Sequence, residues 1–140
     1  MINTIVYYST SSGNVHRFVK MLEKMAGYKT IRIPKRAREE MPVVDEPYCL
    51  IVPTYKGGDS LVDVDLDTVP KQVVKFLENE TNRDNAKVVS VSGNINFIED
   101  YCIAGTQIEK TYGIPYRHRF EMSGTPHDAH VLIEGLRQYK

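Results

Sequence analysis

Residues 4–14, TIVYYSTSSGN, decide the fold: a short apolar strand runs directly into a series of hydroxyl side chains. The continuous β-rich run at 4–8 is typical of a strand covered on both faces in a parallel sheet. A helix is expected next, capped by Asn14 and ended by Gly27, because apolar residues recur between them at three- and four-residue spacing. The residues expected to face inward from this helix are Val15, Phe18, Val19, Leu22 and Met25.

The pattern of strand and helix repeats along the chain, though less regularly. Further strands are expected at residues 30–33, 48–52, 86–91 and 116–120, with a charged connection at 34–47. Helices are expected from Pro70, over about 99–111 and from Pro126, since proline suits the first turn of a helix. The residues expected to face inward from these helices are Val73, Val74, Leu77, Ile103, Ala104, Ile108, Val131, Leu132 and Leu136.

This order of elements predicts an α/β fold: a doubly wound, five-stranded parallel sheet with helices on both faces. We expect the flavodoxin-like strand order 2-1-3-4-5. In such sheets ligands bind beyond the carboxyl ends of the strands, where the strand order reverses, which here is between the first and third strands. Three loops meet at that edge, at residues 9–14, 53–69 and 92–98.

Size and composition limit the class of protein. The 140 residues, 41% hydrophobic and 26% charged, predict one domain over 1–140. The 18 basic and 18 acidic residues balance, so neither a nucleic acid nor an anionic membrane is an expected partner. No apolar run is long enough for a membrane span and no signal peptide is recognisable, so we expect a cytoplasmic protein. Cys49 and Cys102 are expected to be buried free thiols.

The hydroxyl-rich loop has the chemistry of a phosphate site. Its hydroxyls, and the unpaired N–H groups at the start of the following helix, favour an anion. A nucleoside triphosphate site is not expected, because the Walker pattern and its lysine are missing, and no dinucleotide fingerprint is present. The loop also lacks the acidic cluster of a response-regulator receiver and the cysteine of a small tyrosine phosphatase. A loop that only caps the helix is the alternative.

The other two loops suit a planar ring. Tyr55 could lie against an aromatic system, and Gly57 and Gly58 allow close backbone approach. In the third loop, amide and backbone groups can bond the polar edge of a ring, with Phe97 near its face. Together with the phosphate loop they predict bound flavin mononucleotide (FMN). The residues predicted to bind it are Ser9, Thr10, Ser11, Ser12, Gly13, Asn14, Val15, Pro53, Thr54, Tyr55, Lys56, Gly57, Gly58, Ser92, Gly93, Asn94, Asn96 and Phe97.

Several histidines and arginines receive plainer interpretations. His127 and His130 have no carboxylate or cysteine near them in sequence, so they are expected at the surface and no metal site is predicted. His16 is expected at an exposed helix position. The segment 117–119, Arg-His-Arg, is expected to protect an edge strand from pairing.

Longer motifs resemble those of one known family over nearly the whole chain. Besides the phosphate loop, the matching segments are residues 32–34, 44–48, 52–55, 69–73, 92–97 and 119–125. Ser-Gly-Asn-Ile-Asn-Phe at 92–97 and Arg-Phe-Glu at 119–121 are the most specific. These segments resemble the NrdI proteins, flavodoxin-like partners of class Ib ribonucleotide reductase. Two positions depart from the family pattern, because Lys56 and Ile98 stand where glycine is common.

The resemblance implies a protein that binds FMN noncovalently and, once reduced, converts dioxygen to superoxide. The oxidant would serve the dimanganese site of the reductase small subunit, where a tyrosyl radical then forms. The resemblance also implies a flavodoxin- or ferredoxin-type reductase as the electron source. Because the flavin performs the electron transfer, no catalytic side chain is predicted.

Two alternative functions stay open: a general flavodoxin-type single-electron carrier and a flavin-free binding module on the same fold. The balanced charge favours the reductase activator over the general carrier, since electron-carrier flavodoxins are typically strongly acidic. Lys56 could stabilise the anionic reduced flavin if its ammonium lies close to the ring.

Overall fold

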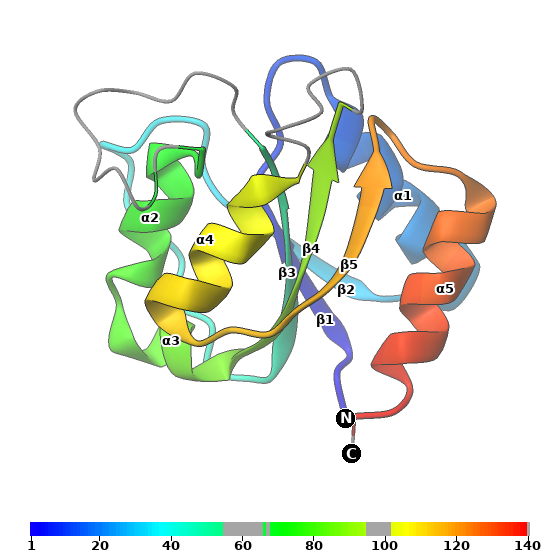
Figure 1. Ribbon diagram of the computed structural model, residues 1–140. Coiled ribbons are helices and arrows are strands. Elements are labelled where there is room, and N and C mark those ends of the chain that lie inside the picture. The colour runs from blue at the N-terminus through cyan, green and yellow to red at the C-terminus, as the bar shows by residue number, and fades with distance from the viewer. Residues whose placement is uncertain (55–65, 67, 95–101, 140) are drawn as a thin grey trace.

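The computed structural model describes residues 1–54, 66, 68–94 and 102–139. Strands and helices follow one another along the chain (Figure 1), although β2 leads to β3 without a helix between them and α2 is followed directly by α3. The strands are β1 (Thr4–Tyr7), β2 (Lys29–Arg32), β3 (Tyr48–Pro53), β4 (Ala86–Gly93) and β5 (Tyr116–Glu121). The helices are α1 (Asn14–Ala26), α2 (Lys71–Leu77), α3 (Glu80–Asn85), α4 (Ile103–Tyr112) and α5 (Pro126–Leu136).

The five strands form one parallel sheet in the order β2-β1-β3-β4-β5, which confirms the predicted topology. Val6 at the centre of β1 lies opposite Ile31 of β2 and Leu50 of β3. All carboxyl ends therefore meet at one edge of the sheet, at the top of Figure 1, and both termini lie at the opposite end.

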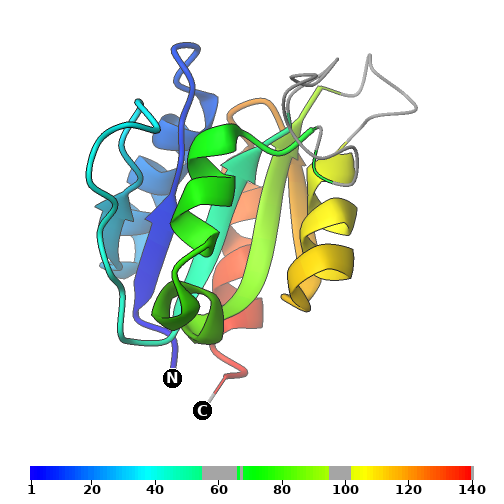
Figure 2. The ribbon, with the colours of Figure 1, turned by 90° about the vertical axis from the view of Figure 1, so that its left-hand side faces the viewer.

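Helices cover both faces of the sheet. Helices α1 and α5 pack on one face, and α2, α3 and α4 pack on the other, which faces the viewer in Figure 2. Alternate residues of a strand enter different cores: Ile5 joins the α1 and α5 side, whereas Val6 joins the α2 and α4 side. The same alternation in β3 separates Cys49 and Ile51 from Leu50. This burial on both faces explains why these strands read as continuous apolar runs.

The helix boundaries correct several expectations. Gly13, with φ 74°, is the N-cap of α1, so Asn14 is the first helical residue and caps nothing with its side chain. Gly27 ends the helix in a left-handed conformation, as predicted. Met25 is 45% exposed, because the buried face of α1 stops at Leu22.

Helices α2, α4 and α5 also differ in detail from the expected inward faces. Val131 is 46% exposed, since the buried positions of α5 are Ala129, Leu132, Ile133 and Leu136 and residue 131 lies on the opposite face. Val74 and Ile103 are half-buried, with Phe76 fully buried in α2. Helix α4 begins at Ile103 rather than near residue 99, because Cys102 adopts a left-handed conformation with φ 56°. Both cysteines are buried and free, as expected.

Helix α3 was not predicted, and a buried asparagine holds it in place. The Asn82 side chain is fully buried, accepts the N–H of Val44 at 2.7 Å and donates to the carbonyls of Pro42 and Phe76. The Asn82 carbonyl accepts the hydroxyl of Tyr48 at 2.5 Å. Long-range polar contacts therefore fix α3 in addition to its local N-cap, in which the Asn79 side chain accepts the Asn82 N–H, and its sequence ETNRDN carries no apolar period.

Candidate functional site

The loop between β1 and α1 is a tight turn lined with hydroxyls. The Gly13 N–H donates to the Thr10 carbonyl at 3.0 Å, and the Thr10 and Ser12 hydroxyls bond each other at 2.8 Å. Ser9 is fully buried, and its hydroxyl accepts the His16 N–H at 3.1 Å. Ser9 therefore links the loop to the first turn of α1. The exposed hydroxyls are those of Ser11 and Ser12.

The first turn of α1 offers donors at this loop. The N–H groups of Asn14 and Val15 have no acceptor within the described residues, as is usual at the start of a helix. They carry the positive end of the helix dipole. Hydroxyls and free N–H groups together are donors of the kind that suits an anion.

A cleft of about 330 Å³ opens beside this turn and reaches the ends of four strands. Its lining includes Val15 and Asn14 from α1, Pro53 from β3 and Gly93 from β4, and the residue after β5, Met122. Met122 was not predicted as a site residue, although it lies within the 119–125 segment that resembles the family. It adopts a left-handed conformation with φ 55°, and its N–H donates to the Gly93 carbonyl at 2.9 Å.

Arg17 and Ser123 are further residues that the sequence analysis missed. Arg17 Nη2 donates to Asn14 Oδ1 at 2.7 Å, and Arg17 Nε donates to Ser123 Oγ at 2.9 Å. Ser123 Oγ in turn donates to Asn14 Oδ1 at 2.9 Å. This triangle joins the start of α1 to the loop after β5, so two walls of the cleft are held together by side chains.

The donor chemistry of the cleft suits a flavin phosphate. Its described lining consists of hydroxyl, amide, apolar and backbone groups, without a carboxylate. Thr54 Oγ1 is buried and has no hydrogen-bond partner among the described residues, while the Thr54 N–H donates to the Ser92 carbonyl. The Ser92 hydroxyl donates to the Met122 carbonyl at 2.6 Å. The residues present therefore fit a phosphate-bearing ligand with a polar ring edge.

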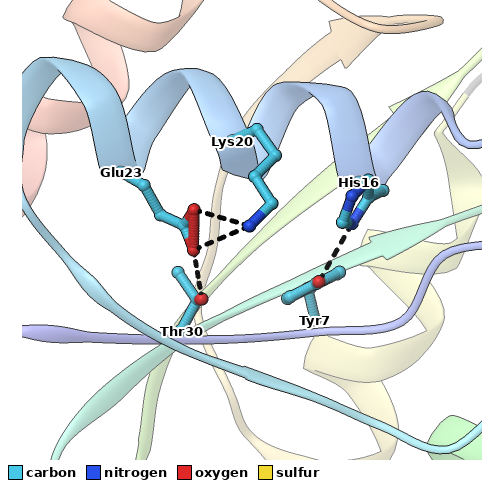
Figure 3. Close-up of polar contacts among 5 residues, drawn as sticks. All are labelled: Tyr7, His16, Lys20, Glu23 and Thr30. Atoms are coloured by element: carbon cyan, nitrogen blue, oxygen red, sulfur yellow. Dashed lines mark hydrogen bonds and ion pairs between the residues drawn. The ribbon is translucent and has the colours of Figure 1, made fainter.

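Polar contacts with the sheet hold α1 in position. Figure 3 shows His16 reaching Tyr7 on β1, with Nδ1 3.0 Å from the Tyr7 hydroxyl, and Glu23 accepting the Thr30 hydroxyl at 2.6 Å. Lys20 pairs with Glu23 at 3.0 Å. His16 is half-buried, so its expected exposure was wrong. Burial, followed by the charges of Arg32 and Lys20, lowers the pKa of His16; hydrogen bonds from Thr30 and then Lys20 lower the pKa of Glu23.

The predicted binding residues fall into three groups. Nine line the cleft: Thr10, Ser12, Asn14, Val15, Pro53, Thr54, Ser92, Gly93 and Asn94. Three belong to the hydroxyl-rich loop after β1 without lining the cleft: Ser9, Ser11 and Gly13. Six lie outside the described residues: Tyr55, Lys56, Gly57, Gly58, Asn96 and Phe97. The structure thus brings together the described parts of all three predicted loops at one edge.

Other chemistries find little support in the described part of the chain. No group of three or more histidine, cysteine, aspartate or glutamate residues is placed there to hold a metal ion. His127 and His130 are exposed, as predicted. Among the helices described, none has the length and apolar character to cross a membrane.

A known protein family matches most of the chain. The family model described as NrdI flavodoxin-like matches residues 6–134. Protein NrdI of Rhodococcus opacus (strain B4) is 44% identical over 138 residues, covering 99% of this chain and 88% of the relative. Protein NrdI of Corynebacterium ammoniagenes is 42% identical over 134 residues, covering 96% of this chain and 90% of the relative.

Solved structures share the fold at low sequence identity. A protein from Bacteroides eggerthii DSM 20697, described as a flavoprotein, superposes with a TM-score of 0.56 at 12% identity, and 96% of each chain is covered. A similarly described protein from Bacteroides uniformis ATCC 8492 has a TM-score of 0.54 at 8% identity, covering 95% of this chain and 98% of that one. At these identities the likeness shows the fold alone.

Proposed function

The chain belongs to the NrdI flavodoxin-like family, and from that premise we propose that it binds FMN and reduces dioxygen to superoxide for a class Ib ribonucleotide reductase. The oxidant would serve assembly of the dimanganese tyrosyl-radical cofactor in the reductase small subunit. The observation that carries the proposal is the cleft at the carboxyl edge of the sheet, which unites the hydroxyl loop with the ends of β3, β4 and β5.

The residues of this chain would bind and orient the cofactor. Thr10, Ser12 and the free N–H groups at the start of α1 would hold the phosphate, because they combine hydroxyl donors with the positive end of a helix. Thr54 and Asn94 would lie along the ring portion, at the ends of β3 and β4. Flavin at this site would supply one-electron chemistry with dioxygen.

The side chains of the cleft support a binding role over an acid–base role. Its described lining has no histidine, carboxylate, lysine or cysteine. General acid–base and nucleophilic catalysis need such a group within hydrogen-bond reach of the reacting atoms. The proposed reaction needs none, since electrons move through the cofactor.

The partners follow from the same proposal. The reductase small subunit, loaded with manganese, would receive the oxidant, and a flavodoxin- or ferredoxin-type reductase would supply electrons. We further propose that this chain acts in the cytoplasm.

The proposal is tested by following radical formation in the partner. The protein is reconstituted with FMN, reduced without oxygen, mixed with manganese-loaded small subunit and exposed to air, and the tyrosyl radical is counted by electron paramagnetic resonance. We expect radical formation that superoxide dismutase suppresses, and little radical with free reduced FMN as the control. Failure to bind FMN would indicate a flavin-free module. Electron transfer to other redox proteins without radical formation would instead indicate a general flavodoxin-type carrier.

A further inference from the structure

Arg17 presents a positive charge at a phosphate loop that has no lysine. Within the described residues its guanidinium makes two hydrogen bonds, both to neutral oxygens, on Asn14 and Ser123. No carboxylate forms an ion pair with it among the described residues, whereas Lys20, Lys29, Arg117 and Arg137 each have an acidic partner. The charge of Arg17 is therefore not neutralised by the described protein.

The third nitrogen of this guanidinium, Nη1, lies beside the loop. A Cβ added to Gly13 would lie 3.0 Å from Arg17 Nη1 and 3.9 Å from Cζ, so Nη1 lies close against the glycine that turns the chain into α1. Nη1 has no hydrogen-bond partner among the described residues. Two of its N–H bonds therefore remain to bind an anion held by the loop.

The same contacts orient Asn14. Asn14 Oδ1 accepts hydrogen bonds from both Arg17 and Ser123, which fixes the direction of the amide. The Nδ2 group is then the end of Asn14 without a partner in the described chain, and Asn14 lines the cleft. By binding Asn14 Oδ1, Arg17 leaves Asn14 Nδ2 available as a donor to the ligand, in addition to its own Nη1.

Arg32 strengthens the positive field on the other side of the loop. Its Nη2 donates to the Ser9 carbonyl at 3.4 Å, and its guanidinium lies 5.8 Å from the centre of the Tyr7 ring. Arg32 is thus directed at the loop backbone and the Tyr7 ring, whereas Arg17 reaches the loop rim and the cleft residue Asn14. Of these two arginines, Arg17 is the one that hydrogen-bonds to the side chain of a residue lining the cleft.

We propose that Arg17 is a specificity-determining residue, whose uncompensated charge makes the cleft prefer the phosphorylated flavin, FMN, over riboflavin. The inference rests on the proposed FMN site and adds the source of its selectivity. A planar guanidinium suits a phosphate because it pairs charge with directed N–H donors. Riboflavin carries the same ring without the phosphate and therefore tests the charge separately from the ring contacts.

The test compares two ligands in matched variants. Dissociation constants for FMN and for riboflavin are measured by flavin fluorescence titration with the wild-type chain, Arg17→Gln and the control Arg137→Gln. Arg137 is an exposed arginine at the end of α5, so its replacement changes the net charge equally, away from the cleft. We expect Arg17→Gln to weaken FMN binding at least tenfold and riboflavin binding less than threefold, while Arg137→Gln changes neither by more than twofold.

Two further measurements separate charge from a merely structural role. Arg17→Lys keeps the positive charge and loses the planar set of N–H donors. Its preference for FMN over riboflavin is therefore expected to lie between those of the wild type and Arg17→Gln. FMN affinity of the wild type is expected to fall more steeply with added salt than that of Arg17→Gln, because screening weakens a charge contact.

The outcomes distinguish this inference from the function on which it rests. Equal weakening of FMN and riboflavin in Arg17→Gln, or an unchanged FMN affinity, would overturn the role of Arg17 while leaving the flavin site in place. A lysine variant no better than the glutamine variant would also overturn it. Wild-type protein that binds neither flavin would overturn the proposed function as well.

Discussion

A glycine in the turn between β5 and α5 shows how single residues shape the cleft wall. Gly124 has φ 69° and its N–H donates to the Glu121 carbonyl at 2.8 Å. A Cβ there would lie 2.6 Å from Phe18 Cδ1 and 3.1 Å from Phe120 Cδ2. The two rings stack with centroids 3.8 Å apart, so neither can move away without disturbing the core. Both backbone conformation and space therefore require glycine at this position.

Replacing Gly124 with alanine is expected to destabilise the protein by about 2–4 kcal/mol. Roughly 1 kcal/mol or more comes from the left-handed backbone and a further 1–3 from overpacking. The matched control is Gly113→Ala, since Gly113 has φ 75° but no atom within 4 Å of an added Cβ. Urea unfolding should show the smaller loss, about 1 kcal/mol, in the control. Equal losses in the two variants would contradict the overpacking term, because the Phe18 ring would then move aside for the added Cβ without lowering stability.

The contact between β5 and α5 depends on a histidine held in its neutral form. His118 Nε2 lies 3.0 Å from the Asp128 carbonyl, which can only accept, so Nε2 carries the proton and Nδ1 accepts the Ser90 hydroxyl at 2.6 Å. Burial lowers the pKa of His118, and the hydrogen bond to the Asp128 carbonyl and the Asp128 charge oppose this only in part. His118 is thus a structural link, whereas the neighbouring arginines at 117 and 119 are exposed at the sheet edge as expected.

This link predicts a loss of stability in mild acid. The folded pKa of His118 lies below its ordinary value of 6.5, so the unfolded chain binds the proton more readily. The contribution of His118 is fully present above pH 6.5 and decreases as the pH falls through the folded pKa. The free energy of unfolding, measured by urea titration between pH 7.5 and 5, should therefore fall more steeply in the wild type than in His118→Gln. Parallel curves would contradict this role for His118.

At the level of the whole molecule, two cores share one sheet. The core under α1 and α5 and the core under α2 and α4 both include residues of β1, β3 and β4. Separating these strands would expose the apolar residues of both cores to water, so neither core can unfold while the other stays buried. We therefore propose that the chain is a single cooperative domain over 1–140.

Calorimetry tests this proposal together with ligand binding. One transition is expected, with equal calorimetric and van't Hoff enthalpies. FMN at a hundredfold excess over its dissociation constant should raise the free energy of unfolding by about 2.7 kcal/mol and move the whole transition upward. Two separate transitions, or a shift that affects only part of the heat absorbed, would show that the two cores unfold independently.

Features encoded in contiguous residues could be predicted without coordinates. Short windows of neighbouring residues were enough to indicate the apolar runs at β1, β3 and β4, the helix-ending Gly27 and the hydroxyl loop. These signals were sufficient for the strand order and for placing nine predicted residues along the cleft. Local periodicity and loop chemistry are enough for this because a parallel α/β sheet brings its carboxyl ends to one edge.

Contacts between distant segments emerged only when the chain was folded. Arg17 and Ser123 are separated by 106 positions, and on sequence alone Arg17 is an ordinary charge on the exposed side of an amphipathic helix. Asn82 likewise has no local pattern that marks it as the buried centre of α3. The physical reason is that a hydrogen bond between remote residues depends on how the helices pack on the sheet, and no short window of sequence contains that packing. The chain's sequence therefore located the hydroxyl loop at the edge of the sheet, and its tertiary structure supplied the arginine that we propose gives the loop its selectivity.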